Sequence, residues 1–530
     1  MVAAAGANGG GAGWQGVGGV ARSPATRGAA MNGRAAMFPG LWRAGLFDPR
    51  RWLRLVAAVA TSGPHLTTLL RIGGTAEGAV VDDLGRTSFD ALARRCDALA
   101  SLLRNRHDVA PGRPVGVLAR NGVPLVRAVF AISRAGGDVF LLNPDMGTLQ
   151  LRDLVEAHAI RLVLAEADTA PLLEGGAARV LDLASLSAQA SAEERPIGRV
   201  APGRIVVLTG GTTGAPKVAA RAPSIANVAR GFADLVGTLD LGGCRSVWIA
   251  VPLFHGFGLA ALLIAVALGR TVRLTRAFDA RRTAACLETE QVDALVVVPT
   301  MLQRLLCLAD ELPALRRIVC GGAQMPPRLA AETRARIGPV LFNLYGTSEA
   351  GVAAMATPDD LAACPDTIGR AIWGVSIDIR DEAGRSLADG VAGHLWVRSS
   401  LASAAGRWLD TGDLAMRDAA GRLFLRGRAD DRIVSGGENV SPWEVERVLL
   451  AHPDVREAAV IGVEDAVYGQ RLVAFVVPRA DGAVDADGLS EWLAPRIARY
   501  QRPRELRLLA ALPLTSIGKI DKRALLATMA

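Results

Sequence analysis

A glycine- and hydroxyl-rich segment at residues 209–217 has the composition of a phosphate-binding loop. It reads TGGTTGAPK: glycines let backbone N–H groups approach phosphate oxygens, threonines donate further hydrogen bonds, and Lys217 supplies a positive charge. A Walker A loop has Gly-Lys-Ser/Thr in succession, whereas Ala215 and Pro216 separate the last glycine from the lysine here. The alternative is a flexible surface turn, because glycine-rich loops also occur without a ligand.

A second polar segment, residues 343–351 (NLYGTSEAG), directly follows the apolar run 340–342. We therefore expect it where a strand of a sheet ends, which is where α/β folds bind ligands. Glu349 is a hard oxygen ligand suited to Mg²⁺, Thr347 a hydrogen-bond partner for a phosphate, and Tyr345 an aromatic face. The alternative is an ordinary strand-to-helix turn with a capping hydroxyl group.

Two segments nearer the C-terminus hold charges that suit a nucleotide. In residues 408–413 (WLDTGD), the Asp413 carboxylate can accept both hydroxyl groups of a ribose. Arg428, in the charged stretch that follows, can approach hydroxyl and phosphate groups together. Residues 513–522 (PLTSIGKIDK) place Lys519 in an exposed loop. Each of these segments alone is also compatible with a structural role.

Short apolar runs that alternate with helical patterns are expected to position these segments. Strands are predicted at 115–119, 138–142, 161–165, 204–208, 246–251, 271–275, 293–298 and 316–320, and helices at 124–135 and 149–159 among others. This alternation predicts parallel sheets covered by helices, in one large layered α/β body. After residue 427, a helix beginning at Pro442, two strands and a helix through Trp492 predict a compact α+β unit. The predicted organisation is a disordered Ala/Gly-rich leader (1–45), a large domain (46–427) and a small domain (428–530).

Composition and charge exclude several classes of function. The six cysteines are scattered, with no CxxC pair and no histidines at ligand spacing, which argues against disulfide frameworks and zinc sites and favours the reducing cytoplasm. The net charge of +8 comes from arginines spread along the chain, a pattern that suits a phosphate-rich ligand and does not indicate nucleic acid. The longest apolar run, residues 256–268, is shorter than the ~20 residues of a membrane span and is expected to be a core helix.

Taken together and in this order, the motifs resemble the acyl-CoA synthetase branch of the adenylate-forming superfamily, which also includes luciferases and peptide-synthetase adenylation domains. The resemblance covers about residues 60–530. It implies a large layered α/β domain with parallel sheets, followed by a small mobile α+β domain. It also implies ATP, Mg²⁺ and coenzyme A as ligands, beside a small carboxylic acid.

The resemblance also implies roles for individual residues. It implies a phosphate loop made of Thr209, Gly210, Gly211, Thr212, Thr213, Gly214 and Lys217. It implies nucleotide contacts for Gly322, Ala323, Tyr345, Gly346, Thr347, Asp413 and Arg428, with Mg²⁺ on Glu349. It implies an acyl pocket lined by His255, Val298, Gly321 and Val352. Gly210 departs from the family, which usually has a serine there, so one side-chain donor to phosphate is lost.

Four further positions match the family's moving parts. Lys519 matches the lysine that bridges the substrate carboxylate and the α-phosphate, and Asp430 matches the hinge of the small domain. Gly436 and Gly437 match a turn along the pantetheine tunnel. The residues expected to carry catalysis are Lys519, Thr347, Glu349, Lys217 and Arg428.

The implied reaction activates a carboxylic acid as acyl-AMP, releases pyrophosphate and passes the acyl group to coenzyme A. The pocket segments carry no fixed charge, so a second carboxylate or an ammonium group would be buried unpaired, and we expect an apolar acid. Small residues such as Gly321, Ala350 and Gly351 leave volume for an extended chain, which favours a medium- or long-chain fatty acid. An aromatic acid in a short flat pocket is the alternative.

Two other functions remain open at this point. The first is an acyl-AMP ligase that loads a carrier protein; such relatives carry an inserted segment, for which residues 351–413 have no spare length. The second is a module that binds adenylates without turnover. It would be expected to lack the lysine, the glutamate or the ribose aspartate, whereas Lys519, Glu349 and Asp413 are all present.

Residues 50–59 (RRWLRLVAAV) form a separate candidate for contact with a partner. A helix here places Trp52, Leu55, Val56 and Val59 on one stripe, with the three arginines off it, as in helices that lie on membrane surfaces. The alternative is that the stripe packs on the protein's own core. We therefore expect a cytoplasmic protein, either free or peripheral to a membrane. The sequence does not indicate an oligomeric state.

Overall fold

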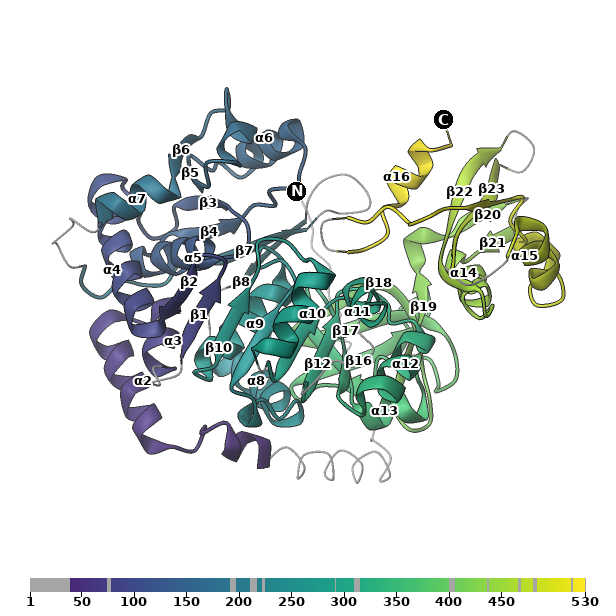
Figure 1. Cartoon of the computed structure of the whole chain (residues 1–530), viewed down its shortest axis with the longest axis horizontal. Helices are drawn as coiled ribbons and strands as arrows, with labels where there is room; N and C mark the ends of the chain where they lie inside the picture. Colours follow the sequence, from purple (N-terminus) through teal and green to yellow (C-terminus); the bar gives the residue numbers. More distant parts are fainter. Residues whose placement is uncertain are drawn as a thin grey trace, which may run out of the picture.

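A computed structural model describes residues 39–73, 78–190, 197–209, 217–221, 225–290, 292–308, 315–399, 406–435, 438–465, 469–479, 484–515 and 518–529, and the structural statements below refer to these residues. We use the names large domain and small domain for the predicted ranges 46–427 and 428–530. The boundary itself remains a prediction. In Figure 1 the small domain stands beside the large body and joins it through β18 and β19.

The large domain contains two sheets of mostly parallel strands, in agreement with the predicted layered body with parallel sheets. The six-stranded sheet has the order β6-β5-β3-β4-β7-β8. Its strands are β3 (Pro114–Leu118), β4 (Asp138–Leu141), β5 (Leu162–Ala165), β6 (Arg179–Asp182), β7 (Ile205–Thr209) and β8 (Lys217–Arg221). Only β8 runs antiparallel to its neighbour. The central strands are buried on both faces, as their continuous apolar runs predict.

The nine-stranded sheet has the order β15-β14-β13-β12-β11-β9-β10-β1-β2 and is parallel from β13 to β1. Its strands are β1 (Ala79–Asp82), β2 (Gly85–Ser88), β9 (Ser246–Ile249), β10 (Thr271–Leu274), β11 (Ala294–Val297), β12 (Arg317–Gly321), β13 (Leu341–Thr347), β14 (Gly351–Ala356) and β15 (Arg370–Ala371). All eight predicted strands are present with ends shifted by at most two residues.

Helices cover both parallel sheets, as the alternating pattern predicted. They are α2 (Pro49–Ser62), α3 (Leu66–Ile72), α4 (Phe89–Arg106), α5 (Val123–Ala135), α6 (Thr148–Ala157), α7 (Leu183–Ala190), α8 (Ile225–Thr238), α9 (Gly256–Ala267), α10 (Ala280–Thr289), α11 (Pro299–Leu306), α12 (Pro327–Ile337) and α13 (Pro358–Ala363). The apolar run predicted as a core helix is α9, which buries Leu259, Leu262 and Val266. Among the described residues, no helix is both long and apolar enough to cross a membrane.

A four-stranded antiparallel sheet, which the sequence analysis did not predict, completes the large domain. Its strands are β16 (Val375–Arg380), β17 (Gly393–Ser399), β18 (Trp408–Arg417) and β19 (Leu423–Arg428). The single turn η3 (Ala429–Asp431) then leads into the small domain. The small domain contains β20 (Ile433–Ser435), β21 (Glu438–Val440), α14 (Pro442–Leu450), β22 (Val455–Asp465), β23 (Gly469–Pro478), α15 (Ala486–Leu493), β24 (Glu505–Leu508) and α16 (Lys522–Ala527).

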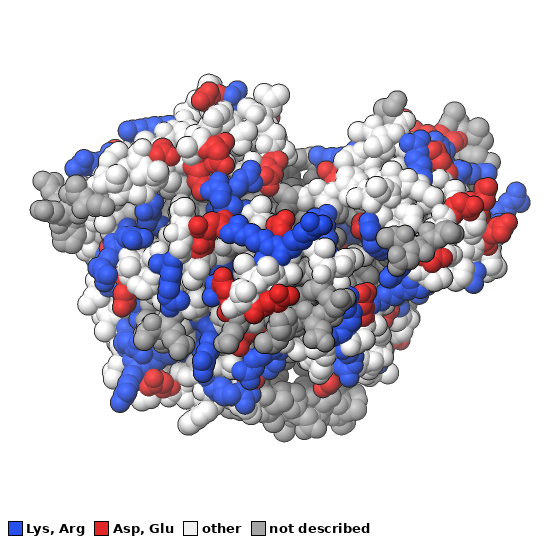
Figure 2. All heavy atoms as spheres, viewed as in Figure 1, with Lys and Arg blue, Asp and Glu red and all other residues white. Residues whose placement is uncertain are grey.

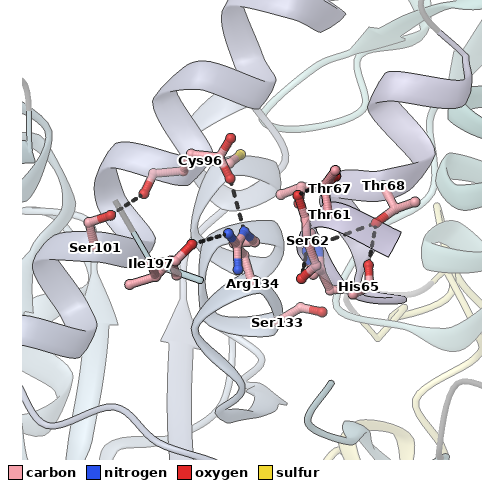
Figure 3. Close-up of polar contacts among 12 residues, drawn as sticks. Thr61, Ser62, His65, Thr67, Thr68, Cys96, Ser101, Ser133, Arg134 and Ile197 are labelled. Carbon is pink, nitrogen blue, oxygen red and sulfur yellow. Dashed lines mark hydrogen bonds and ion pairs between the residues drawn. The ribbon is translucent and has the colours of Figure 1, made fainter. Parts of the chain in front are cut away.

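A buried polar network holds the N-terminal helices onto the six-stranded sheet (Figure 3). The His65 ring donates from Nε2 to the Ser62 carbonyl (2.9 Å) and accepts at Nδ1 from the Thr67 hydroxyl (2.5 Å). The guanidinium group of Arg134 donates to Asp97 (3.1 Å) and to the carbonyls of Ile197 (2.7 Å) and Gly198. Since these groups come from α3, α4, α5 and the segment before β7, the network fixes four parts of the chain together.

Candidate active site

The ribose-binding aspartate predicted from the sequence lies where two sheets of the large domain meet. Asp413 on β18 is paired across the strands with Arg428 on β19, and the two side chains are 3.2 Å apart. The hydroxyl group of Tyr345, on β13 of the nine-stranded sheet, donates to the other Asp413 oxygen (2.5 Å). The structure thus brings together three residues that are widely separated in sequence.

The charges around Asp413 are strongly coupled. Burial raises the pKa of the Asp413 carboxyl group, while Tyr345, Arg428 and Lys519 act in the opposite direction. Burial and the neighbouring Asp413 raise the pKa of the Tyr345 hydroxyl group well above its usual range, so it stays a donor. The bidentate hydrogen bond from Arg428 to Asp430 (2.7 and 3.0 Å) raises the pKa of that guanidinium group further. Arg428 therefore remains a fixed cation between the predicted ribose and hinge residues.

The segment 343–351 forms a β-hairpin, which corrects the prediction that it follows the end of a strand. Strand β13 continues through Thr347, and the chain returns antiparallel as β14 from Gly351. The Thr347 hydroxyl accepts a hydrogen bond from the Ala350 amide (3.0 Å) inside the turn. The half-buried Glu349 lies in the same turn. Thr347 therefore ends β13, and Glu349 lies in the turn that follows, next to the parallel part of the sheet.

The Lys519 loop reaches from the small domain to the large domain. The carbonyl of Gly518 accepts a hydrogen bond from the Thr300 hydroxyl (3.0 Å). A Cβ atom at Gly518, where φ is +74°, would lie 2.8 Å from Thr300 Oγ1 and 2.8 Å from Val298 Cγ2. Only glycine fits at position 518 without displacing these side chains. This close packing places Lys519 so close to Asp413 and His255 that its charge affects the pKa of both.

The Lys519 side chain is accessible to solvent over part of its surface but lies among many protein atoms. Burial of its charge among surrounding protein atoms lowers the pKa of the ammonium group, Asp413 raises it, and Arg428 lowers it. Besides Lys519 and Lys217, which begins β8, the chain has one more lysine. This residue, Lys522, forms an ion pair with Asp431 (2.9 Å). Just three of the 60 lysine and arginine residues are lysines, namely Lys217, Lys519 and Lys522. The use of lysine in place of arginine at a position of this chain is therefore a signal of a specific role.

His255 stays neutral at the edge of the predicted acyl pocket. Burial, with a smaller effect of the Lys519 charge, lowers the pKa of the imidazole to about 3. Its ring lies against Phe254, with centroids 4.7 Å apart. The buried Nε2 atom has no hydrogen-bond partner within the described part of the chain. The ring therefore offers a polar atom toward the site without a charge.

Phe257 is a pocket residue that the sequence analysis did not single out. Its Cζ atom lies 3.5 Å from the position that a Cβ atom at Gly321 would take, and its Cδ1 atom 4.0 Å from that at Gly322. The same would-be Cβ atom of Gly322 lies 3.5 Å from Val298. The phenyl ring thus lies at van der Waals distance from the Cβ position of Gly321, while the Leu344 carbonyl oxygen (2.9 Å) and Cβ atom (3.4 Å) lie closer to it. Its position two residues after His255, at the start of a helix, was the available signal.

The hairpin side of the predicted pocket is closed as well. Ala350 is completely buried, and a Cβ atom at Gly346 would meet the Gly351 carbonyl oxygen at 2.4 Å. The absent side chains there allow β13 and β14 to pack closely. Val352 is only half-buried. At Gly346 and Ala350 the space is therefore filled by the hairpin itself, and the length of the acid that the pocket accepts stays a prediction.

The predicted phosphate loop is described only at its two ends. Thr209 ends β7 and Lys217 begins β8, and their backbones are paired antiparallel. Gly210, Gly211, Thr212, Thr213 and Gly214 lie outside the described residues, as do Gly436 and Gly437 of the predicted tunnel turn. The phosphate contacts of the predicted phosphate loop stay a prediction. The adenine contact predicted for Gly322 and Ala323 also stays a prediction, on the turn after β12 where Gly322 has φ +81°.

A cleft of about 430 Å³ opens at the junction of the two domains. Its lining includes Phe254, Thr300 and Arg304 of the large domain, together with Thr515 and Gly518 of the small domain. Farther along the junction, Arg328 on α12 donates to the carbonyls of Ala451 and His452 (both 2.7 Å), at the end of α14. The cleft therefore lies directly beside the Lys519 loop.

Comparison with known proteins provides independent information on this arrangement. Residues 75–405 match the family described as AMP-binding enzyme, and residues 444–519 match the AMP-binding enzyme C-terminal domain. The chain is 30% identical to the indoleacetate–CoA ligase of Aromatoleum aromaticum, over 82% of this chain and 92% of that protein. It is 31% identical to the 2-succinylbenzoate–CoA ligase of Bacillus licheniformis, over 84% and 96%.

A solved structure with the same fold is the o-succinylbenzoate CoA synthetase from Bacillus subtilis in complex with its acyl-adenylate intermediate. The TM-score is 0.77 at 27% identity, covering 87% of this chain and 98% of that one. This similarity confirms the predicted fold class of a large α/β domain with parallel sheets and a smaller C-terminal domain. Among the described residues, no group of three or more His, Cys, Asp or Glu side chains could hold a metal ion by itself.

Proposed function

The chain belongs to the AMP-binding enzyme family, and from this premise we propose that it is an ATP-dependent acid:CoA ligase for an aromatic monocarboxylic acid. The prediction of an AMP-forming acid–thiol ligase is confirmed, because the similar proteins are CoA ligases over nearly their whole length. The sequence analysis ranked a fatty acid first and an aromatic acid second. The aromatic acids in the names of the relatives support the aromatic alternative. The residues around the predicted pocket support it as well.

The position of Phe257 carries this choice of acid. The Leu344 main chain and the Phe257 ring lie against Gly321, and Ala350 is buried in the hairpin, which supports a pocket with little depth for an extended chain. An aromatic acid suits such a pocket, because a flat ring stacks on an aromatic side chain and on bare glycine backbone. His255 stays neutral, and the predicted pocket residues carry no charge, so a second carboxylate would be buried unpaired.

In the first step, a carboxylate oxygen of the acid bonds to the α-phosphorus of ATP, and the bond from that phosphorus to the pyrophosphate oxygen breaks. Attack by an anion on a polyanion needs alignment and neutralisation of charge more than proton transfer. Lys519 supplies a cation between the acid and the α-phosphate, while Asp413, held by Tyr345 and Arg428, fixes the ribose. The neutral His255 ring adds no competing charge beside Lys519.

Glu349 is the residue proposed to hold Mg²⁺. A single half-exposed carboxylate beside a threonine hydroxyl fits this ion, because Mg²⁺ in nucleotide sites is held by one or two carboxylates together with phosphates and water. When bound, the ion would neutralise phosphate charge. Thr347 would contact the phosphates next to it.

In the second step, the coenzyme A thiol loses its proton to solvent, its sulfur bonds to the acyl carbon, and the bond from that carbon to the phosphate oxygen breaks, so that AMP leaves. The cleft beside the Lys519 loop supports entry of the thiol from the domain junction, since Thr300 and Gly518 line it. Arg304, exposed at its edge, offers a positive charge for phosphate groups of coenzyme A. We propose that the small domain turns about Asp430 between the two steps, as the family resemblance implies.

The experiment is a panel of acids assayed with ATP and coenzyme A, following pyrophosphate release and the mass of the thioester. The panel contains indole-3-acetate, cinnamate, benzoate, 2-succinylbenzoate and a homologous series of fatty acids from acetate upward. We expect an aromatic monocarboxylate to have the highest kcat/KM and 2-succinylbenzoate to be poorer. A steady rise with fatty-acid length would overturn the choice of acid, and no pyrophosphate release with any acid would contradict enzymatic function.

A substitution at Phe257 tests the structural reason. Phe257→Ala should lower kcat/KM for the best aromatic acid and raise it for fatty acids of intermediate length, because the space over Gly321 is opened. Phe278→Ala, in the lining of the junction cleft, is the matched control and should leave the order of acids unchanged. An unchanged order in Phe257→Ala would show that this ring does not set the acid.

A further inference from the structure

Helix α2 buries small residues against the rest of the large domain and exposes its large apolar residues. This is the reverse of an ordinary surface helix. Its buried residues are Ala58 and Ser62, which are small. Its large apolar side chains point outward: Trp52 is 53% exposed, Leu53 70% and Val56 63%. An amphipathic helix normally buries its large apolar residues and exposes the others. The predicted alternative, in which the stripe packs on the protein's own core, therefore holds only for the half-buried Leu55 and Val59.

The exposed side chains of α2 continue into the turn that precedes it. Trp42 is 73% exposed and Phe47 51%, with ring centroids 6.1 Å apart. The Trp52 indole donates to the Leu46 carbonyl (2.8 Å), which brings that ring beside the turn. We call the set Trp42, Phe47, Trp52, Leu53 and Val56 the α2 patch. Scattered single apolar residues need no explanation, but a contiguous patch with three aromatic rings marks an interaction surface.

The charges beside the α2 patch favour one kind of partner. Helix α2 contains no acidic residue, and on a helical wheel Arg50 and Arg54 lie together beside the arc that holds Leu53 and Val56. Both arginines are exposed. Arg51, by contrast, turns inward and donates to the carbonyls of Ala44 and Ala267, so it anchors the helix to the domain. Figure 2 shows basic side chains over the corner of the molecule where Figure 1 places α2.

We propose that the α2 patch docks the protein onto the surface of a membrane that contains anionic lipids. Tryptophan and phenylalanine rings with leucine and valine enter the boundary between headgroups and acyl chains, while arginines beside them meet lipid phosphates. Arg51 holds the helix in place, so docking needs no rearrangement of the large domain. The active-site residues Tyr345 and Asp413 belong to other elements, so the bound enzyme keeps its site free.

The test is co-sedimentation of the full chain with phosphatidylcholine vesicles, with and without phosphatidylglycerol. We expect binding to the anionic vesicles that weakens in high salt, because exposed charges are then screened. The triple variant Trp52→Ser, Leu53→Ser, Val56→Ser should lose at least about tenfold in partitioning. The matched control Leu84→Ser, Leu149→Ser changes leucines that are 84% and 75% exposed on other elements and should bind like the parent chain.

Two further measurements keep the proposal falsifiable. Thermal unfolding of the triple variant should match that of the parent, because the changed side chains are exposed, so lost binding cannot be attributed to misfolding. Sedimentation velocity without lipid identifies another occupant. A dimer that the triple variant abolishes would assign the patch to a second copy of the chain and overturn the proposal, as would a monomer that does not bind either kind of vesicle.

Discussion

The junction between the two domains and the polar network around His65 use hydrogen bonds in opposite ways. At the junction, Arg328 and Thr300 of the large domain donate to main-chain carbonyls of the small domain. Both donors are near the surface, so they can turn to water when the contact is lost. In the network, the nearly buried Arg134 faces Asp97, and separating that pair would leave an unpaired charge.

This difference separates a part of the molecule that can move from one that cannot. A contact made by a surface side chain to a carbonyl contributes about 1 kcal/mol and can form or break without a large penalty. A buried ion pair that loses one partner costs several kcal/mol. The proposed turn of the small domain therefore has a structural basis at the junction. The α2–α5 region should behave as a rigid support in both steps.

The largest effect is expected at the junction itself, from Lys519→Ala. Acyl-AMP formation should fall by about 100-fold or more, because the cation that bridges the reacting anions is lost. Thioester formation from supplied acyl-AMP should be largely spared, since Lys519 is proposed to act only in the first arrangement. The two half-reactions are measured separately by pyrophosphate release and thioester mass. Lys522→Ala is the control, and equal loss of both half-reactions in Lys519→Ala would contradict the two-arrangement hypothesis.

The next largest effect is expected in the network, from Asp97→Ala. Removing this carboxylate leaves Arg134 and Arg71 without their shared partner, and the free energy of unfolding should fall by about 3 kcal/mol. Urea unfolding measures this loss. Arg94→Ala, at an exposed position of the same helix, should stay within about 0.5 kcal/mol of the parent. The rates of the two half-reactions per folded molecule should not change; a selective loss of one would mean that the network is not a rigid support.

A pH effect of about 2 kcal/mol is expected from His65. Burial and the charge of Arg134 lower the pKa of its imidazole to about 4. The unfolded chain binds a proton at this residue below about pH 6.5, whereas the folded chain binds it only near pH 4, so stability falls as the pH decreases through that window. Protonation would also make Nδ1 a donor and break the hydrogen bond from Thr67.

The measurement is the free energy of unfolding at pH 7 and at pH 5 for the parent and for His65→Gln. The parent should lose about 2 kcal/mol more than the variant between these two values. The other histidines with lowered pKa, His107 and His255, are common to both proteins and cancel in the difference. An identical loss in both proteins would show that His65 does not titrate in this window.

The smallest effect is expected from Arg328→Ala, which removes three hydrogen bonds across the junction, to the carbonyls of Ala451, His452 and Pro453. Acyl-AMP formation should slow by up to about tenfold, because the arrangement that seats Lys519 becomes less populated. Thioester formation from acyl-AMP and the urea midpoint should stay unchanged. Arg334→Ala, on the same helix, is the control. Slower thioester formation in Arg328→Ala would indicate that both arrangements use this contact.

The sequence predicted local structure well and the assembly of sheets less well. Runs such as VGVL and ALVV are too apolar to be anything but buried strands, and their ends came out within two residues. The division into two parallel sheets depends on which strands become neighbours. Pairings such as β1 with β10 join residues almost 200 positions apart, and no local pattern encodes them. The hairpin at 343–351 was missed because Thr347 and Ser348 resemble helix caps when the returning strand is not known.

The individual residues of the site were predicted from the sequence. Their proximity in space and the volume of the pocket were not. Asp413 and Arg428 follow from motifs, yet only the register of β18 on β19 and the reach of Tyr345 show that they share one site. Small residues at 321 and 350 suggested space for a long chain. Sequence cannot show what lies in the space left by an absent side chain, and at Gly321 it is Leu344 with Phe257 beside it.

The close packing around Gly518 bears on how long the Lys519 loop stays on the large domain during the reaction. The atoms that a side chain at 518 would strike belong to Thr300, which holds the loop, and to Val298, which belongs to the predicted acyl pocket. One valine thus belongs to the predicted acyl pocket and also borders the loop that carries Lys519. An acid that pushes Val298 aside would shorten the dwell time of that loop on the large domain. Selectivity at this pocket can therefore be kinetic as well as steric, with a poorly fitting acid releasing the loop before the adenylate has formed.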